Sequence, residues 1–175
     1  MRGELIRLRA MTESDGAALW RWNHDPEVMR WMDDGYPQTE ARVRASLAER
    51  PRNAHGDVLF GIETAGPEGT LIGLVRLHGA TPETGCAELD IYLGEKEYWG
   101  RGYATDAMRT ACRYGFDDMR LHKISLTVAT ENHAARRVYE KVGFVEEGRL
   151  RQVFRRDGQW YDMFTMGLLA DELRR

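Results

Sequence analysis

The sequence has little of several features that mark particular classes of protein. Its two cysteines, Cys86 and Cys112, lie far apart without a partner motif, which favours reduced thiols in a cytoplasmic protein over a disulfide framework. No apolar run approaches the roughly 20 residues of a membrane span, so we expect no membrane association. The five histidines show no ligand spacing, and we expect no metal site. A net charge of −3 gives no electrostatic argument for binding nucleic acid.

What remains is the composition of one globular domain. A hydrophobic fraction of 42% and a charged fraction of 30% are ordinary for such a domain, and 175 residues suffice for one sizeable core. The sequence shows no internal repeat, low-complexity segment or linker, so we expect a single domain over residues 1–175. No apolar stretch follows residues 1–4, and we therefore expect no signal peptide.

The first third of the chain predicts one strand and three helices. Alternating residues predict a strand over 5–10, and possible N-caps precede a helix that starts near residue 17. Asp, Pro and Glu at 25–27 are typical of an N-cap followed by proline at the first helical position, which predicts a second short helix through residue 32. A third helix is expected from 39 to about 49, ended by Pro51.

The middle of the chain changes to a strand pattern. Runs rich in strand-forming residues cover 58–62, 71–77 and 86–93, and clusters of turn residues separate them. Because the connections are short, the three strands are expected to form an antiparallel meander.

The last third alternates helices and strands and closes on a hairpin. Small and apolar residues with a period of about 3.6 predict a helix over 104–119 that can approach the sheet closely. A strand over 123–130 and a helix over 132–142 follow, with Gly143 at the expected C-cap. Two strands around a turn at 156–159 complete an α/β (α+β) domain: a single mixed, mostly antiparallel sheet of six to seven strands, flanked by helices.

A glycine loop, Tyr-Trp-Gly-Arg-Gly-Tyr-Ala-Thr at 98–105, joins a predicted strand to the helix that follows. Its glycines let the backbone come close to a ligand, and the first turn of the helix offers unpaired N–H groups. Such a loop suits an anion, typically a phosphate, and Arg101 adds charge. The alternative is a glycine turn needed only for packing. The Walker and Rossmann patterns do not fit, since no Gly-Lys-Ser/Thr follows and Thr105 occupies the place of the third glycine.

A second motif covers residues 132–144. On a helix, Asn132 and Tyr139 are seven residues apart and lie at the border of an apolar stripe. A tyrosine at such a border can keep its ring in the core and present its hydroxyl to a cleft. The alternative is a tyrosine that only packs. The expected stripe consists of Ala134, Ala135, Val138 and Val142.

Together, the two motifs resemble the GNAT superfamily of acetyl-CoA-dependent N-acetyltransferases. The loop contributes Gly-Arg-Gly-Tyr-Ala, and the second motif reads Asn-x-x-Ala-x-x-x-Tyr-x-Lys-x-Gly-Phe. The chain is most similar to the branch of ribosomal-protein N-terminal (RimJ/RimL-type) and spermidine acetyltransferases, from Leu5 to about Leu168. The resemblance implies a GNAT-like acyltransferase fold, acetyl-CoA as the acetyl donor without a metal, and N-acetyltransferase activity.

The resemblance also implies roles for individual residues. Asn132 would contact the cofactor near the thioester, and Tyr139 would protonate the departing CoA thiolate, for which a phenol with a pKa near 10 is suited. Ile91, Tyr92 and Leu93, at the splayed end of their strand, would pair with the pantetheine arm. The CoA pyrophosphate would be bound by backbone amides of Trp99, Gly100, Arg101, Gly102, Tyr103, Ala104 and Thr105.

Two positions depart from the family pattern. Trp99 stands where many members have Gln or Arg, so one side-chain contact to phosphate is missing. Ala135 replaces a common serine, and we assign no nucleophile there. We therefore expect direct attack of the amine on the thioester in a ternary complex, with the oxyanion held by backbone amides of the strand over 86–93.

An attacking amine must be neutral, which calls for a base or a water relay. Glu88 and Asp90 alternate onto one face of the strand over 86–93, close to the expected thioester, and are the candidate bases. The alternative for each is a solvated or ion-paired carboxylate. His78, on the preceding strand, is a further candidate.

The acceptor is predicted less narrowly. Aromatic residues beside acidic ones would suit a cationic amine, and the alternative is a tryptophan-rich core edge with a solvated turn. We expect a protein N-terminal amine as the acceptor; a polyamine or another small amine is the alternative. An inactive acyl-CoA-binding module and a nucleotide-binding protein are alternatives from other classes, and an unpaired sheet edge would allow a homodimer or a higher homo-oligomer. The candidate acceptor residues are Trp31, Asp33, Asp34 and Tyr36, with Trp20 and Trp22 on the preceding helix.

Overall fold

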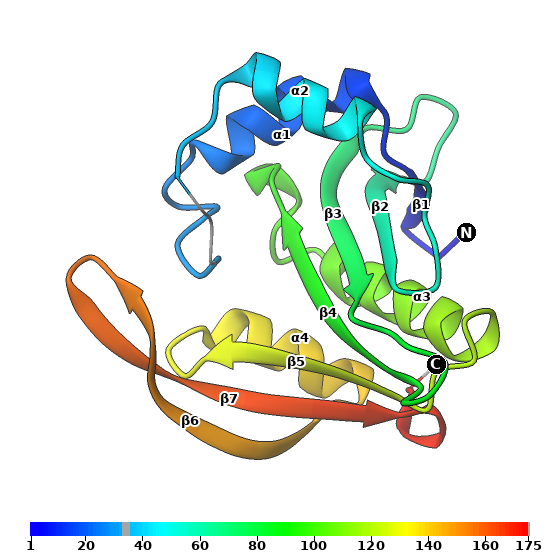
Figure 1. Cartoon of the computed structure of the whole chain (residues 1–175), viewed down its shortest axis with the longest axis vertical. Coiled ribbons are helices and arrows are strands. Elements are labelled where there is room, and N and C mark those ends of the chain that lie inside the picture. Colours follow the sequence, from blue (N-terminus) through cyan, green and yellow to red (C-terminus); the bar gives the residue numbers. More distant parts are fainter. Residues whose placement is uncertain (33–35, 175) are drawn as a thin grey trace.

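The computed structural model describes residues 1–32 and 36–174, which form one seven-stranded sheet with helices on both faces (Figure 1). The strand order is β1-β2-β3-β4-β5-β7-β6, and every neighbouring pair is antiparallel except β4 and β5. This confirms the predicted mixed, mostly antiparallel sheet. The strands are β1 (Ile6–Ala10), β2 (Asp57–Thr64), β3 (Leu71–His78), β4 (Cys86–Leu93), β5 (Lys123–Ala129), β6 (Val145–Arg156) and β7 (Gln159–Leu169).

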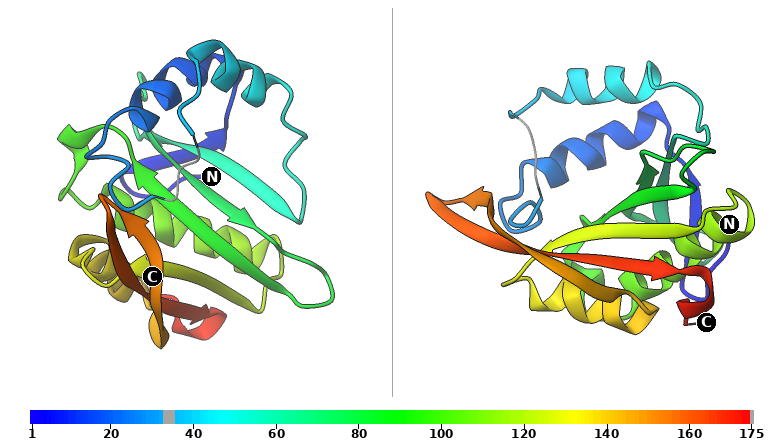
Figure 2. Two further views of the ribbon diagram at one scale, coloured as in Figure 1. Left: turned by 60° about the vertical axis from the view of Figure 1, so that its left-hand side comes forward. Right: turned by 60° about the horizontal axis from the view of Figure 1, so that its bottom comes forward.

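The helices are divided between the two faces of the sheet, as the three views show (Figures 1 and 2). Helices α3 and α4 lie on one face, and α1 and α2 lie over the other. The described α-helices are α1 (Gly16–Asn23), α2 (Glu40–Ala48), α3 (Tyr103–Asp117) and α4 (His133–Val142); short 3-10 turns are η1 (Glu13–Asp15), η2 (Lys96–Tyr98) and η3 (Ala170–Glu172). None of the helices in the described ranges has the length and apolar character needed to span a bilayer.

The two halves of the sheet are joined by a short parallel contact. β4 and β5 pair only at Cys86–Lys123, Ala87–Ile124 and Glu88–Ser125. Beyond Glu88, β4 stays paired with β3, whereas β5 beyond Ser125 stays paired with β7. The two strands therefore diverge and leave a V-shaped opening in the sheet (Figure 1).

The main core lies between the sheet and α3. Met108 and Ala111 of α3 are fully buried and belong to one cluster with Ile72 of β3 and Ile124 of β5. A Cβ at Gly115 would lie 2.9 Å from Cδ1 of Ile124, so glycine is what allows this close approach. The close helix-to-sheet packing predicted from the small residues of this helix is confirmed.

A smaller cluster packs α1 onto the opposite face. Trp22 is 1% exposed and lies edge-on to Tyr92 of β4, with 6.2 Å between ring centroids. The Tyr92 hydroxyl donates a hydrogen bond to Oδ1 of Asn23 at 3.0 Å. Val28 and Met29 complete the cluster. This contact fixes the outer end of β4 against the N-terminal helices.

Two local predictions were wrong. The segment after Asp25 forms successive turns through residue 32 instead of a helix. Asp25 Oδ1 does accept the N–H groups of Glu27 and Val28 like an N-cap, but burial of Val28 and Met29 against Trp22 stops the helix after one turn. In α4, Ala134 is exposed and Tyr139 occupies the buried stripe instead.

Candidate active site

The free edge of β4 lines the V-shaped opening. Ser125 Oγ donates to the carbonyl of Ala87 from the β5 side, whereas the N–H of Gly94 donates to Ile72 of β3. Because hydrogen-bonding direction alternates along a strand, the N–H and C=O groups of Leu89, Ile91 and Leu93 face the opening. They lie beyond the last residue paired with β5. The opening therefore offers a strand edge that an extended chain can pair with.

The glycine loop stands at the open end of β4. Gly100 and Gly102 have φ of 72° and 89°, and their missing Cβ atoms would point into open space or no closer than 3.5 Å to Leu5. In the described part of the chain, the backbone N–H groups of residues 100–105 have no hydrogen-bond acceptor. They belong to the glycine loop and the first turn of α3, a helix of 15 residues. This arrangement fits an anion such as a pyrophosphate without further rearrangement.

Asp106, the acidic residue in the first turn of α3, does not direct its charge into this anion-binding site. Asp106 Oδ2 accepts the N–H groups of Leu5 at 2.7 Å and Ile6 at 3.1 Å. These bonds compensate its charge and fasten the start of β1 to the helix. The phosphate-binding site predicted from the sequence includes no role for Asp106.

Tyr139 is placed on α4 with its ring in the core. The residue is 9% exposed, its ring lies 6.1 Å from that of Phe144, and it joins the main core cluster. Burial raises the pKa of Tyr139, and the negative charge of Asp90 raises it further. The phenol thus stays protonated well into the alkaline range. Its position is deeper than the border position expected from the sequence.

Asn132 acts as the N-cap of α4. Its Oδ1 accepts the N–H of Ala135 at 3.2 Å, which satisfies one of the free amides of the first turn. The carboxamide oxygen is therefore engaged locally, and only its NH₂ group remains to meet a ligand. The residue that the sequence linked to the cofactor thus has a structural role in placing α4.

Glu88 and Asp90 lie together on the face of β4 opposite α3. Asp90 Oδ2 lies 2.9 Å from Nε2 of His78 on β3, and its side chain is 50% exposed. Glu88 is exposed and has no ion-pair partner among the described residues. Glu88 is the last β4 residue paired with β5, and Asp90 follows where the strands part. The structure therefore brings together the three sequence-predicted base candidates.

The aromatic residues of the N-terminal segment do not form one wall. Trp22 is buried in the core, and Tyr36 is 90% exposed. Trp20 donates its indole N–H to the carbonyl of Gln38 at 3.1 Å. Trp31 instead meets the hairpin of β6 and β7. Asp33 and Asp34 lie outside the described residues.

The partners of Trp31 were not singled out from the sequence. Its ring lies 5.3 Å from Tyr161, edge-on, and 6.2 Å from Phe154. Phe154 and Tyr161 are opposite each other in the hairpin. The predicted turn at 156–159 would already have placed them on one face, but no local signal shows that Trp31 reaches them.

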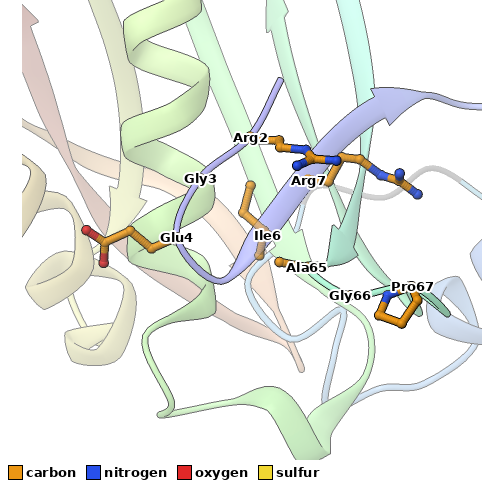
Figure 3. A pocket seen from close by; sticks show the side chains of 8 residues that line it. All are labelled: Arg2, Gly3, Glu4, Ile6, Arg7, Ala65, Gly66 and Pro67. Carbon is orange, nitrogen blue, oxygen red and sulfur yellow. The ribbon is translucent and has the colours of Figure 1, made fainter.

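Two hollows on the surface are separate from the opening beside β4. One is bounded by Arg151, Gln152 and Asp162 on the β6–β7 hairpin. The other lies beside β1, between residues 2–7 and the turn that follows β2 (Figure 3). Since β1 forms the outer edge of the sheet, three strands separate that hollow from the opening beside β4. Neither includes a residue of the loop, and we place the candidate site at the opening.

Comparison with known proteins gives the family. The profile described as an acetyltransferase (GNAT) domain matches residues 6–145. The spermidine N(1)-acetyltransferase of Vibrio cholerae is 32% identical over 168 residues, 95% of this chain and 94% of that protein. The putative ribosomal N-acetyltransferase YdaF of Bacillus subtilis is 31% identical over 138 residues, 78% of this chain and 74% of that protein.

Solved structures agree with this assignment. The spermidine N-acetyltransferase of Vibrio cholerae in complex with CoA and spermine matches with a TM-score of 0.83 and 28% identity, over 96% of this chain and 97% of that chain. A GNAT acetyltransferase from Bacillus anthracis matches with a TM-score of 0.81 and 26% identity, over 98% and 99% of the two chains. The seven-stranded sheet with its helices is thus a GNAT fold. The chain belongs to the GNAT family and is an acetyl-CoA-dependent N-acetyltransferase.

Proposed function

We propose that this N-acetyltransferase transfers the acetyl group to a primary amine of a polyamine such as spermidine. The relatives named as spermidine acetyltransferases cover nearly the whole chain and support the polyamine alternative over the protein N-terminal amine that we expected from the sequence. The relative named as a putative ribosomal N-acetyltransferase covers less of it.

The observation that carries the proposal is the pair of carboxylates at the point where β4 and β5 begin to part. Glu88 and Asp90 share one face of β4, and both are exposed to solvent. A polyamine carries several ammonium groups in a flexible chain. Two carboxylates in a row can hold one ammonium and accept the proton of another, which a single peptide N-terminus would not require.

The aromatic residues fit the methylene segments of such an acceptor. Trp31 is half-buried and held by Tyr161, and Tyr36 presents almost its whole ring to solvent. Aromatic faces attract alkylammonium groups through cation–π contacts. We assign Trp31 and Tyr36 to the acceptor side, with Asp33 and Asp34 in the segment between them.

We assign the acetyl-CoA site to the glycine loop and the open edge of β4. The free amides of residues 100–105 fit the donor's pyrophosphate, since they lack acceptors among the described residues and lie at the N-terminus of α3. We assign this seat to residues 99–105. Ile91 and Leu93 offer the free edge of β4 to the pantetheine arm, and the NH₂ of Asn132 completes the contacts. Tyr92, which we expected from the sequence to pair with the arm as well, turns its backbone groups to Leu74 of β3 instead. Bound acetyl-CoA supplies the activated thioester.

The chain's own residues then move two protons. Asp90, assisted by Glu88, takes the proton from the ammonium group, so that the neutral amine attacks the thioester carbonyl directly. Backbone N–H groups of β4 stabilise the oxyanion. When the carbon–sulfur bond breaks, the thiolate takes the proton of the Tyr139 hydroxyl. The nitrogen of the tetrahedral intermediate gives up its second proton to solvent, so that the products are the acetamide and free CoA. Solvent then reprotonates Tyr139 and removes the proton from Asp90.

Thiol release from acetyl-CoA tests this function. We expect release with spermidine and spermine, and little with aminoglycosides or peptides that have a free N-terminus. Mass spectrometry of the product should show a singly acetylated polyamine. Release with the peptides and none with the polyamines would overturn the assignment and restore the protein N-terminal acceptor. CoA binding without release in the whole panel would support an inactive binding module instead.

A further inference from the structure

Trp99 links the free edge of β4 to the glycine loop, the two elements of the proposed acetyl-CoA site. It directly precedes Gly100 in the glycine loop, and its indole Nε1 donates a hydrogen bond to the carbonyl of Leu93 at 2.9 Å. Its backbone N–H is engaged by the carbonyl of Lys96 at 3.0 Å. The residue is 38% exposed, so its ring is held at the surface and is not part of the core. One side chain thus bridges the end of β4 and the start of the loop.

The hydrogen bond from Trp99 to Leu93 reduces the number of free backbone acceptors on the open edge of β4. Three residues, Leu89, Ile91 and Leu93, turn their N–H and C=O groups toward the opening. Of the carbonyls, the outermost is engaged by the Trp99 indole. An extended ligand entering from the loop therefore first meets the N–H of Leu93, and its own first N–H group finds an acceptor only at Ile91.

We propose that Trp99 is a positioning residue for the pantetheine arm of the donor. By engaging the Leu93 carbonyl, it leaves one register in which the arm can pair with β4, and it fixes the distance between that strand and the phosphate seat. The side chain therefore acts on the arm and leaves the pyrophosphate to the backbone amides. The proposal rests on the donor seat assigned above and is independent of which amine is acetylated.

A pair of ligands separates this role from a contact to phosphate. CoA carries both the pyrophosphate and the pantetheine arm, whereas adenosine 3′-phosphate 5′-diphosphate carries the pyrophosphate alone. Trp99→Phe keeps an aromatic ring and removes the N–H donor. Calorimetry should show a Kd for CoA about threefold to tenfold higher in the variant, the effect of one lost hydrogen bond, and an unchanged Kd for the nucleotide.

A control variant and steady-state kinetics test whether the effect is specific to Trp99 and to the donor. Trp160→Phe, at an exposed tryptophan on the β6–β7 hairpin, is the matched control and should leave both Kd values unchanged. In steady-state kinetics, Trp99→Phe should raise the KM for acetyl-CoA in the same proportion and leave the KM for the amine unchanged. The unchanged nucleotide Kd also shows that the variant is folded.

The outcomes are distinct. Equal weakening of CoA and the nucleotide would place Trp99 on the phosphate and overturn the proposal, as would unchanged affinity for both. Hydrogen exchange of the wild-type protein tests the seat itself, since CoA should protect the amides of Ile91 and Leu93. Absence of that protection would contradict the assigned seat, whatever the Trp99 variant shows.

Discussion

The Asp106 carboxylate accepts the backbone N–H of Leu5 at 2.7 Å, although 101 positions separate the two residues in sequence. A second bond to the N–H of Ile6 makes the contact a fork that holds the beginning of β1. The chain thereby uses an acidic residue at a helix N-terminus without placing an uncompensated negative charge beside the phosphate seat. The first strand and the glycine loop are fastened to the same turn of α3.

This fork predicts a stability effect that is separate from ligand binding. Replacement Asp106→Ala leaves two backbone donors without their acceptor, and we expect it to lower the free energy of unfolding by about 1–3 kcal/mol. Urea denaturation measures this change. Asp106→Asn retains one acceptor oxygen and should lose less. The Kd for CoA should change by less than about twofold, since the amides of residues 100–105 remain in place; a large loss of affinity would place Asp106 in the seat itself.

Replacement Tyr139→Phe tests the proton donor. The ring remains in the core, so thermal stability and CoA affinity should stay near wild type, whereas kcat should fall about 100-fold. Tyr114→Phe, another ring packed against the core, serves as the control and should retain activity. Because burial and Asp90 raise the pKa of Tyr139, the donor stays protonated at high pH. The wild-type kcat should therefore show no loss from this group as the pH rises from about 8 to about 10. Full activity of Tyr139→Phe would remove the residue from the mechanism.

The carboxylates of β4 predict a split between the two substrates. Replacements Glu88→Gln and Asp90→Asn should each raise the KM for spermidine about threefold to tenfold, because each removes one attraction for an ammonium group. The KM for acetyl-CoA should not change. Asp90→Asn should also lower kcat more than Glu88→Gln does, since Asp90 is the assigned base. Glu68→Gln, in the exposed turn before β3, is the matched control. Equal effects on both substrates would indicate a general loss of structure instead.

An ion pair away from the site predicts how stability depends on pH. Asp57 of β2 meets Arg76 and Arg50, with 2.8 Å between each closest N···O pair. The bonds from Arg76, followed by those from Arg50, lower the pKa of Asp57 to about 2. A depressed pKa stabilises the folded state above the unfolded value near 3.8, and this contribution is lost as the pH falls toward 2. Since the carboxylate is 39% exposed, solvent screening reduces its contribution to the free energy of unfolding to about 1 kcal/mol.

Chemical denaturation of Asp57→Asn across pH measures this contribution. The variant should be about 1 kcal/mol less stable than wild type from about pH 5 upward, and the difference should vanish near pH 2. A difference that persists undiminished at the lowest pH would show that the loss comes from packing and not from charge.

The elements predicted correctly are those with a strong local signal. The helix over 104–119 has a clean apolar period, and the structure places α3 at Tyr103–Asp117. The turn at 156–159 was predicted from its glycine and aspartate, and both central residues adopt positive φ, 52° at Asp157 and 77° at Gly158. The glycine loop likewise carries its own conformational requirement. These features depend on neighbours in sequence.

The features that were missed depend on neighbours in space. The turns after Asp25 replace a helix because Val28 and Met29 pack on Trp22. Trp31 meets Phe154 and Tyr161 on a hairpin more than a hundred residues away, and no local pattern indicates that contact. Tyr139 lies deeper than its place on the helix suggested, because Ala134 turns outward. The pairing of β4 with β5 ends after Glu88, where β4 continues beside β3 and β5 beside β7, and no local pattern indicates this point.

The short contact between β4 and β5 bears on the protein's behaviour at high concentration. A strand with unpaired backbone groups usually invites pairing with a neighbouring molecule, and proteins protect such edges with charges, bulges or proline. Here the unpaired groups of Leu89 and Ile91 lie inside the sheet, between two strands of the same chain, and not at its rim. A second folded copy has no access for side-by-side pairing there. The enzyme can thus keep open the strand edge that we propose for its donor, without an added risk of aggregation at that edge.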